Sequence, residues 1–200
     1  MPLIESRGAS PRIDAGALVA STAVVSGDVT VGAGSRILHG AVLTAEDGPI
    51  VIGRNVVVLE NAVVRGRAGH PTVIGDDVMI GPHAHINGST IGTASFVATG
   101  ASLFPGSVIG EGAEVRINAV VQVNTRVAAG EVVPISWVAV GDPAQLFSPD
   151  RHDEIWAVQR TLNFVGTVYG AGPDATMSDI MRGQSEYYGA HRSDRTLPEA

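Results

Sequence analysis

The chain has 200 residues, 44% of them hydrophobic but only 4% aromatic, and carries a formal net charge of −7. Its 13 basic residues are all arginines and are scattered, which excludes a nucleic-acid-binding surface, and the lack of cysteine excludes disulfides and thiolate metal sites. No signal-peptide pattern and no run of about 18 apolar residues is present, so we expect a soluble cytoplasmic protein that does not enter a membrane.

A six-residue repeat dominates the first two-thirds of the chain. Residues 1–12 form an expected N-terminal lead-in, after which aliphatic residues recur every six positions in four runs that begin at Ile13, Ile52, Ile74 and Ile91. Neither the helical period of about 3.6 nor the strand period of 2 produces this spacing. Hexapeptide repeats do, because each short strand points one aliphatic residue into a narrow prism. We therefore predict an all-β solenoid, a parallel β-helix, over residues 13–142.

Two places interrupt the repeat. Ile-Gly or Val-Gly dipeptides mark one corner per coil, and the later ones are about three hexads apart. The earlier gaps are longer, which predicts short insertions near residues 44–51 and 65–73.

The sequence predicts a helical tail over residues 143–200. Ser148, Pro149 and Asp150 form a typical helix start, because Ser caps the helix and Pro is tolerated at its first position. We expect one helix over 149–164, a short second helix near 175–188, and a poorly ordered segment at 190–200. Tyr187 and Tyr188 are the natural anchors if this tail docks on the solenoid.

Stacked coils leave open strand edges and flat apolar sides. Such edges invite association unless a cap, a helix or another subunit covers them. A homotrimer is therefore expected.

Several blocks of the chain resemble the γ-class carbonic anhydrase-like branch of the hexapeptide-repeat proteins. They are Gly40–Leu43, Gly48–Asn55, Pro71–Asp77 and Val138–Ala144. The resemblance covers about residues 10–165 and implies a left-handed β-helix, a three-fold trimer and a site at each subunit interface. In active members of that family, three His residues bind zinc or a similar ion there, two from one subunit and one from its neighbour.

The resemblance does not extend to the metal ligands. The three family His positions fall on Arg65, Pro82 and Asn87, the family glutamine falls on Leu59, and Thr44–Glu46 replaces an Arg-Gly-Asp run. A guanidinium cannot become a ligand and its charge opposes a dication. No metal is expected at the family positions and no cofactor is expected, so we predict that the family reaction is lost.

Arg65 suggests another use for the same pocket. A guanidinium in a cleft anchors a carboxylate or phosphate, and Asn87 can add an amide contact, so we predict a small anionic ligand. Glu60 and Glu46 complete the predicted substrate-binding set. Alternatively, one of these two carboxylates pairs with Arg65 in an internal ion pair.

Two histidines lie beside the lost ligand positions. His83 and His85 are the candidate catalytic residues, because His titrates near neutral pH. The alternatives are that both are ordinary exposed turn residues, or that they hold a relocated zinc or other divalent ion for a hydratase or hydrolase.

An acyltransferase that uses acyl-coenzyme A is a further alternative, since many hexapeptide β-helices transfer acyl groups. His39, His70, His83 or His85 would then act as the general base. A purely structural role is the fourth possibility, because a fold does not fix a function.

Overall fold

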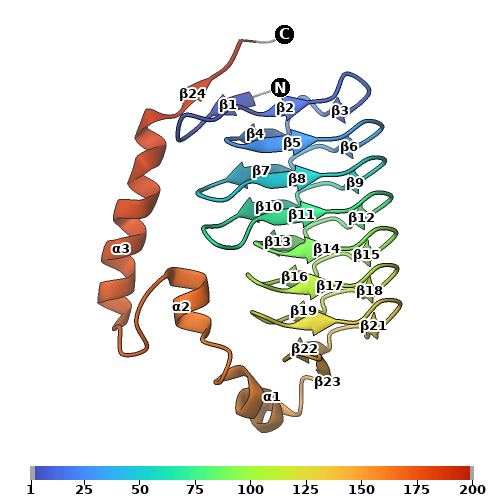
Figure 1. Cartoon of the computed structure of the whole chain (residues 1–200), viewed down its shortest axis with the longest axis vertical. Coiled ribbons are helices and arrows are strands. Elements are labelled where there is room, and N and C mark those ends of the chain that lie inside the picture. Colours follow the sequence, from blue (N-terminus) through green and yellow to red (C-terminus); the bar gives the residue numbers. More distant parts are fainter. Residues whose placement is uncertain (1–2, 199–200) are drawn as a thin grey trace.

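The computed structural model describes residues 3–198, which form a left-handed parallel β-helix followed by a helical tail. Three sheets make up the walls of the prism (Figure 1). Each coil contributes one short strand to each sheet, so that neighbours in a sheet come from successive coils.

The ten-stranded sheet, here called the tail-side sheet, has the spatial order β23 (Gln145–Phe147), β22 (Val138–Val140), β19 (Val120–Val121), β16 (Ser102–Leu103), β13 (His85–Asn87), β10 (Val63–Gly66), β7 (Val42–Ala45), β4 (Val24–Ser26), β1 (Leu3–Glu5), β24 (Arg195–Thr196). The second sheet has the order β2 (Arg12–Ile13), β5 (Val29–Val31), β8 (Ile50–Ile52), β11 (Thr72–Ile74), β14 (Thr90–Ile91), β17 (Val108–Ile109), β20 (Arg126–Val127). The third has the order β21 (Val132–Val133), β18 (Glu114–Val115), β15 (Phe96–Val97), β12 (Met79–Ile80), β9 (Val57–Val58), β6 (Arg36–Ile37), β3 (Leu18–Val19).

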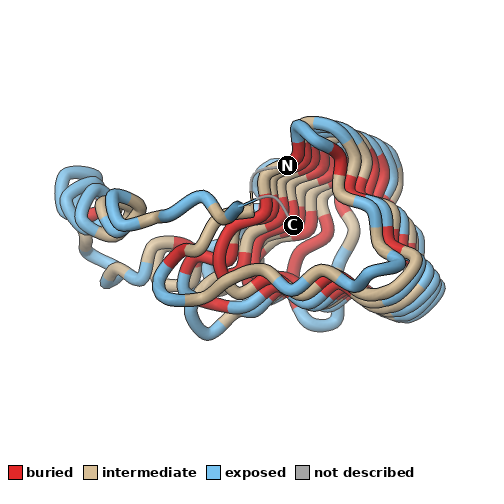
Figure 2. The backbone as a smooth tube through the Cα atoms, turned by 90° about the horizontal axis from the view of Figure 1, so that it is seen from above, coloured by how far each residue is buried: buried red, intermediate tan, exposed pale blue. Residues whose placement is uncertain are grey.

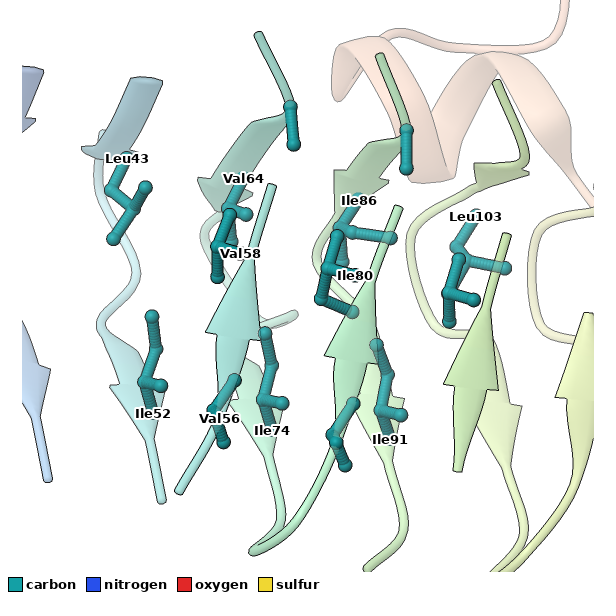
Figure 3. Packing of buried hydrophobic residues seen from close by; sticks show 14 of the residues in the cluster. Leu43, Ile52, Val56, Val58, Val64, Ile74, Ile80, Ile86, Ile91 and Leu103 are labelled. Carbon is teal, nitrogen blue, oxygen red and sulfur yellow. The ribbon is translucent and has the colours of Figure 1, made fainter. Parts of the chain in front are cut away.

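The aliphatic residues of the hexapeptide repeat fill the centre of the prism. Figure 3 shows them in rows along the axis, and one row joins Leu43, Val64, Ile86 and Leu103 through the strand register. All four are fully buried. Burial of each such side chain stabilises the fold by about 1.5–3 kcal/mol, so the period predicted from the sequence is also the source of its stability.

Both predicted insertions are present as loops at one corner. One connects β7 to β8 and the other connects β10 to β11. They project from the prism towards the tail, as the teal and green loops of Figure 1 show. The tail-side sheet also includes residues that precede the repeat, because β1, in the N-terminal lead-in, pairs in parallel with β4.

The tail contains α1 (His152–Gln159), α2 (Phe164–Tyr169), α3 (Met177–Gly189) and a 3-10 turn, η1 (Ala190–Ser193). The helix predicted over 149–164 is shorter, because α1 begins at His152 and ends at Gln159. Asn163, left-handed with φ 53°, then prevents a single helix from continuing to residue 164. The second predicted helix is confirmed as α3, which Thr176 caps. No helix within residues 3–198 is long and apolar enough to cross a bilayer.

The expectation of a poorly ordered 190–200 segment was wrong for its described part. After η1, β24 pairs antiparallel with β1, with Ile4 opposite Thr196 and Glu5 opposite Arg195. The tail thus runs back along the whole prism and covers the first edge of the tail-side sheet (Figure 1). The open edge of β1 supplies the hydrogen bonds that order this segment. Residues 199–200 lie outside the described residues.

Candidate functional site

Arg65 and Asn87 lie side by side on the tail-side sheet. Val64 and Ile86 point into the core, so the next residue of each strand points outward. The register places Arg65 of β10 directly opposite Asn87 of β13. Two of the three positions that hold His in the related family therefore meet on adjacent coils.

These positions do not fit a zinc ion. Pro82 lies in the turn before β13 and has no ligand atom in its side chain. Arg65 adds a fixed positive charge where a dication would sit. Within residues 3–198, no three His, Asp or Glu side chains are grouped as metal ligands. The donor set of this face therefore suits an anion better than a cation.

The side chain that contacts Arg65 comes from the tail. Tyr188 of α3 accepts hydrogen bonds through its phenol oxygen from Nη1 of Arg65, at 3.0 Å, and from Nη1 of Arg67, at 3.2 Å. Arg67 also donates to the carbonyl of Val168, at 2.9 Å. Two guanidinium groups, both only partly exposed, thus converge on one neutral oxygen.

Neither guanidinium is neutralised nearby. Among residues 3–198, no carboxylate lies within ion-pairing distance of Arg65 or Arg67. The predicted pairing of Arg65 with Glu46 or Glu60 is therefore wrong. Glu60 is exposed in the turn before β10, at the opposite end of that strand from Arg65. The two guanidiniums at Tyr188 therefore have no direct ion pair among the described residues.

Asn87 contributes an unsatisfied polar group to this region. Its residue is only 6% exposed, and its Oδ1 has no hydrogen-bond partner among the described residues. A buried amide without a partner costs roughly 1–3 kcal/mol. Since the amide can turn to present its NH2 group, it can donate to an anion held by Arg65.

Glu46 binds the tail rather than Arg65. Its buried carboxylate lies 3.0 Å from Nε2 of His191 and 3.9 Å from Nη2 of Arg7. Nδ1 of His191 is 2.8 Å from Asp194. The hydrogen bond to Asp194 is the largest cause that raises the pKa of His191 above its ordinary value; burial opposes it, and the charge of Glu46 adds to the rise. His191 therefore clamps the tail to the β7–β8 loop.

Tyr187 makes a second contact with that loop. Its phenol donates to Asp47 at 2.7 Å, and burial, reinforced by this bond, raises its pKa. The guanidinium carbons of Arg7 and Arg67 lie 4.6 and 5.2 Å from the centre of its ring. Such cation–π contacts contribute about 0.5–2 kcal/mol each. Tyr187 and Tyr188 thus anchor the tail, as the sequence suggested.

The two candidate catalytic histidines occupy different environments. His83 is exposed at a corner, in the left-handed conformation with φ 57°. His85 is half-buried on β13, next to the ring of Phe104. Burial, and then the charge of Arg65, lowers the pKa of His85. His85 is therefore held neutral beside the arginine cluster, and His83 does not share its surroundings.

The two other histidines considered from the sequence lie apart from each other. Nδ1 of His39 is hydrogen bonded to Thr22 at 2.8 Å on an exposed corner. His70 lies in the β10–β11 loop, against Gly88 and Gly106. Among residues 3–198, neither His39 nor His70 makes a hydrogen bond to His85.

Sequence reasoning missed Arg67, Asp47 and His191. The run Arg65–Arg67 did carry a signal, since residues two apart on a strand face the same side. Asp47 and His191 carried no signal in the sequence, because their roles depend on how the tail docks. Tyr188 also lines an open groove of about 880 Å3 formed by α2, α3 and η1. The same tyrosine thus contacts both this groove and the two guanidiniums.

Comparison with known proteins supports the relationship suggested by the sequence blocks. No family model matches the chain. It is 35% identical over 153 residues to gamma carbonic anhydrase 1, mitochondrial, of Arabidopsis thaliana, which is 73% of this chain and 53% of that protein. It is 34% identical over 163 residues to gamma carbonic anhydrase 2, mitochondrial, of the same plant, covering 78% and 56%. The chain spans about half the length of the curated relatives it matches.

The solved structures extend the likeness of the fold. A candidate acetyltransferase from Bacillus cereus superimposes with a TM-score of 0.57 and 21% identity, covering 92% of this chain and 95% of that one. At this identity the match shows a shared fold alone. Together with the hexapeptide repeat, it shows that the chain has the left-handed β-helix fold of hexapeptide-repeat proteins, and its sequence is similar to those of gamma carbonic anhydrases.

Proposed function

We propose that this protein binds a small oxyanion, such as a carboxylate or a phosphate, between Arg65 and Arg67, without a metal ion. The observation that carries the proposal is the convergence of both guanidiniums on the phenol oxygen of Tyr188, with no carboxylate partner. Two like charges held together repel, and an anion relieves that repulsion. Planar guanidiniums bind carboxylate and phosphate in a fork geometry, which favours this ligand class.

Asn87 and His85 complete the proposed site. Asn87 lies opposite Arg65, and its buried amide oxygen has no hydrogen-bond partner among the described residues. His85 is neutral because burial and Arg65 lower its pKa, so it is the residue suited to exchange a proton with a bound ligand. His83 faces solvent at a corner and is not part of the proposed site.

A homotrimer remains part of the proposal. Apolar side chains stay exposed on the two sheets that the tail does not cover. Val51 and Val73 on the second sheet and Met79 on the third are between 36% and 42% exposed. A neighbouring subunit that packed against these sheets would bury them, as apolar interfaces commonly do.

Calorimetric titration with inorganic phosphate, sulfate and succinate tests the anion site. At least one of these should bind the wild type, and Arg65→Gln or Arg67→Gln should weaken that binding about tenfold or more, because a charge-assisted hydrogen bond is lost. Arg126→Gln, an exposed arginine on the second sheet, should bind like the wild type. Binding should survive dialysis against EDTA.

Light scattering of the same sample should give three times the 20.6 kDa chain mass. Failure of all three anions to bind would overturn the proposed site, as would equal effects of the Arg65 and Arg126 substitutions. Loss of binding with EDTA would overturn its metal independence.

A further inference from the structure

Tyr188 holds the position that an oxygen of a bound anion would take. Its phenol oxygen is 3.0 Å from Arg65 and 3.2 Å from Arg67, which are ordinary hydrogen-bond distances. The same residue lines the open groove of about 880 Å3 formed by α2, α3 and η1. A ligand in this groove therefore contacts the residue whose phenol oxygen occupies the guanidiniums.

We infer that the tail inhibits the anion site by occupying it, so that an oxyanion binds only in exchange for Tyr188. This inference rests on the anion site proposed above. Docking of the tail and binding of the anion then exclude one another, and each weakens the other by the same free energy. A neutral phenol oxygen is a weaker partner for two guanidiniums than a charged oxygen, so a ligand can displace it.

Other contacts limit how readily the tail leaves. Tyr187 donates to Asp47, and His191 lies 3.0 Å from the buried Glu46. Farther on, Arg195 pairs with Glu5. The amide of Leu197 donates to the carbonyl of Leu3 at 2.7 Å. The tail therefore behaves as a strap fastened at several points: Tyr188 occupies both guanidiniums, and the carbonyl of Val168 holds Arg67 as well.

The clamp at His191 makes this strap sensitive to pH. The charged or titratable groups that face His191 are Glu46 and Arg7 from the solenoid and Asp194 and Tyr188 from the tail. The pKa of His191 in the docked tail is raised above 6.5, chiefly by its bond to Asp194. Its stabilisation of the docked tail is then complete below pH 6.5 and is lost as the pH rises through the raised pKa. The strap should open more easily under mildly basic conditions.

Sulfate is the probe of choice, since its charge is constant over this range. Tyr188→Phe keeps the ring and removes the oxygen, so the variant should bind sulfate about tenfold more tightly than wild type, because two charge-assisted bonds no longer compete. The control, Thr161→Ala, removes a tail hydroxyl that bonds the carbonyl of Val158, and should bind like the wild type. Sulfate should also speed hydrogen exchange of the amides of residues 187–197 in the wild type.

The possible outcomes distinguish failure of the inhibition by the tail from failure of the anion site itself. Equal sulfate affinity of wild type and Tyr188→Phe, or exchange in 187–197 that sulfate leaves unchanged, would overturn the strap but leave the anion site. Weaker binding by Tyr188→Phe would make Tyr188 a ligand contact and also overturn it. If neither protein binds sulfate, phosphate or succinate, the site itself fails.

The pH dependence gives an independent check. Between pH 6.5 and 8.5, sulfate affinity of the wild type should rise about two- to fivefold, the effect of losing one partly exposed ion pair. His191→Gln should show no such rise. His85 does not interfere in this window, since its lowered pKa leaves it neutral there. An equal rise in His191→Gln would exclude His191 as the clamp.

Discussion

Arg65 and His85 lie on neighbouring coils of the same sheet, and the charge of one affects the protonation of the other. Burial is the larger cause of the lowered pKa of His85, and Arg65 is the second. Because the folded-state pKa lies below the ordinary 6.5, the neutral form contributes stability above pH 6.5. That contribution is lost as the pH falls through the lowered pKa. Mild acid should therefore weaken the fold around β13.

Replacement of Arg65 by Gln should raise the pKa of His85, since one positive charge is removed. The pKa should stay below 6.5, because the burial remains. Nuclear magnetic resonance titration of the His85 ring protons measures this directly, and Arg126→Gln serves as the control. An unchanged or lower pKa in Arg65→Gln would contradict the electrostatic coupling.

Single residues of the site could be predicted from sequence only in part. The six-residue period fixes which residues point outward, so the pairing of Arg65 with Asn87 follows from local spacing and the family blocks. The tail residue that contacts Arg65 cannot be predicted from local spacing in this way. Tyr188 is 123 residues away along the chain, and Glu46 was the nearer choice by charge. Only the path of the tail decides between them.

The helix α3 is weak by composition and depends on its first turn. It contains Gly183 and ends at Gly189, and glycine lowers helix stability by about 1 kcal/mol per residue. Thr176 and Asp179 compensate through a reciprocal capping box, in which each side chain bonds the backbone of the other. The order of the tail therefore depends on a cap that lies at the far end of α3 from Tyr188.

Thr176→Ala should reduce the stability of α3 by about 1 kcal/mol, because the cap is removed. Faster amide exchange across residues 177–189, with little change in the solenoid, is the expected result. Thr161→Ala provides the control, since that hydroxyl bonds Val158 in the turn after α1. Equal protection of α3 in wild type and Thr176→Ala would contradict the role of the cap.

The contrast between α3 and β24 shows what sequence can predict about elements. The signals for α3 lie within the helix itself, so its position was predictable. The strand β24 has two exposed residues, Arg195 and Thr196, and no apolar pattern. It is extended because β1 offers an unpaired edge. An element that takes its conformation from a distant partner leaves little trace in its own residues.

The whole solenoid is a stack in which each coil contacts mainly the coils on either side. Its stability is then close to a sum over coils and their interfaces, so that the ends are weaker than the middle. The buried residues follow this pattern. Ile86 is fully buried in the middle of the stack, whereas Ile13 in the first complete coil is only partly buried.

Ile86→Ala should lower the free energy of unfolding by about 2–5 kcal/mol, because it leaves a cavity between two packed coils. Ile13→Ala should have a clearly smaller effect, since its side chain is already partly in water. Urea unfolding followed by circular dichroism compares the two variants. A larger loss for Ile13→Ala would show that the stack is not held by its middle coils.

The architecture of the whole molecule was the most predictable level. A period of six over more than a hundred residues leaves few alternatives, and Figure 2 shows the coils superimposed along one axis with a buried interior. The same figure shows α3 to one side of the prism, a placement that no periodicity specifies. The homotrimer remains a prediction, because flat apolar sides favour association without fixing its geometry.

The pairing of β24 with β1 has a consequence for synthesis on the ribosome. One edge of β1, the first strand to leave the ribosome, waits for a partner at least 190 residues later in the chain, which is the separation of Glu5 from Arg195. At a translation rate of roughly 5–20 residues per second, the edge of β1 stays uncovered for about 10–40 s. During that time the growing prism offers the unpaired edge of β1 to nearby nascent chains. Rare codons in the tail would lengthen this exposure. A chaperone bound to the first coil would protect the edge of β1 during this time.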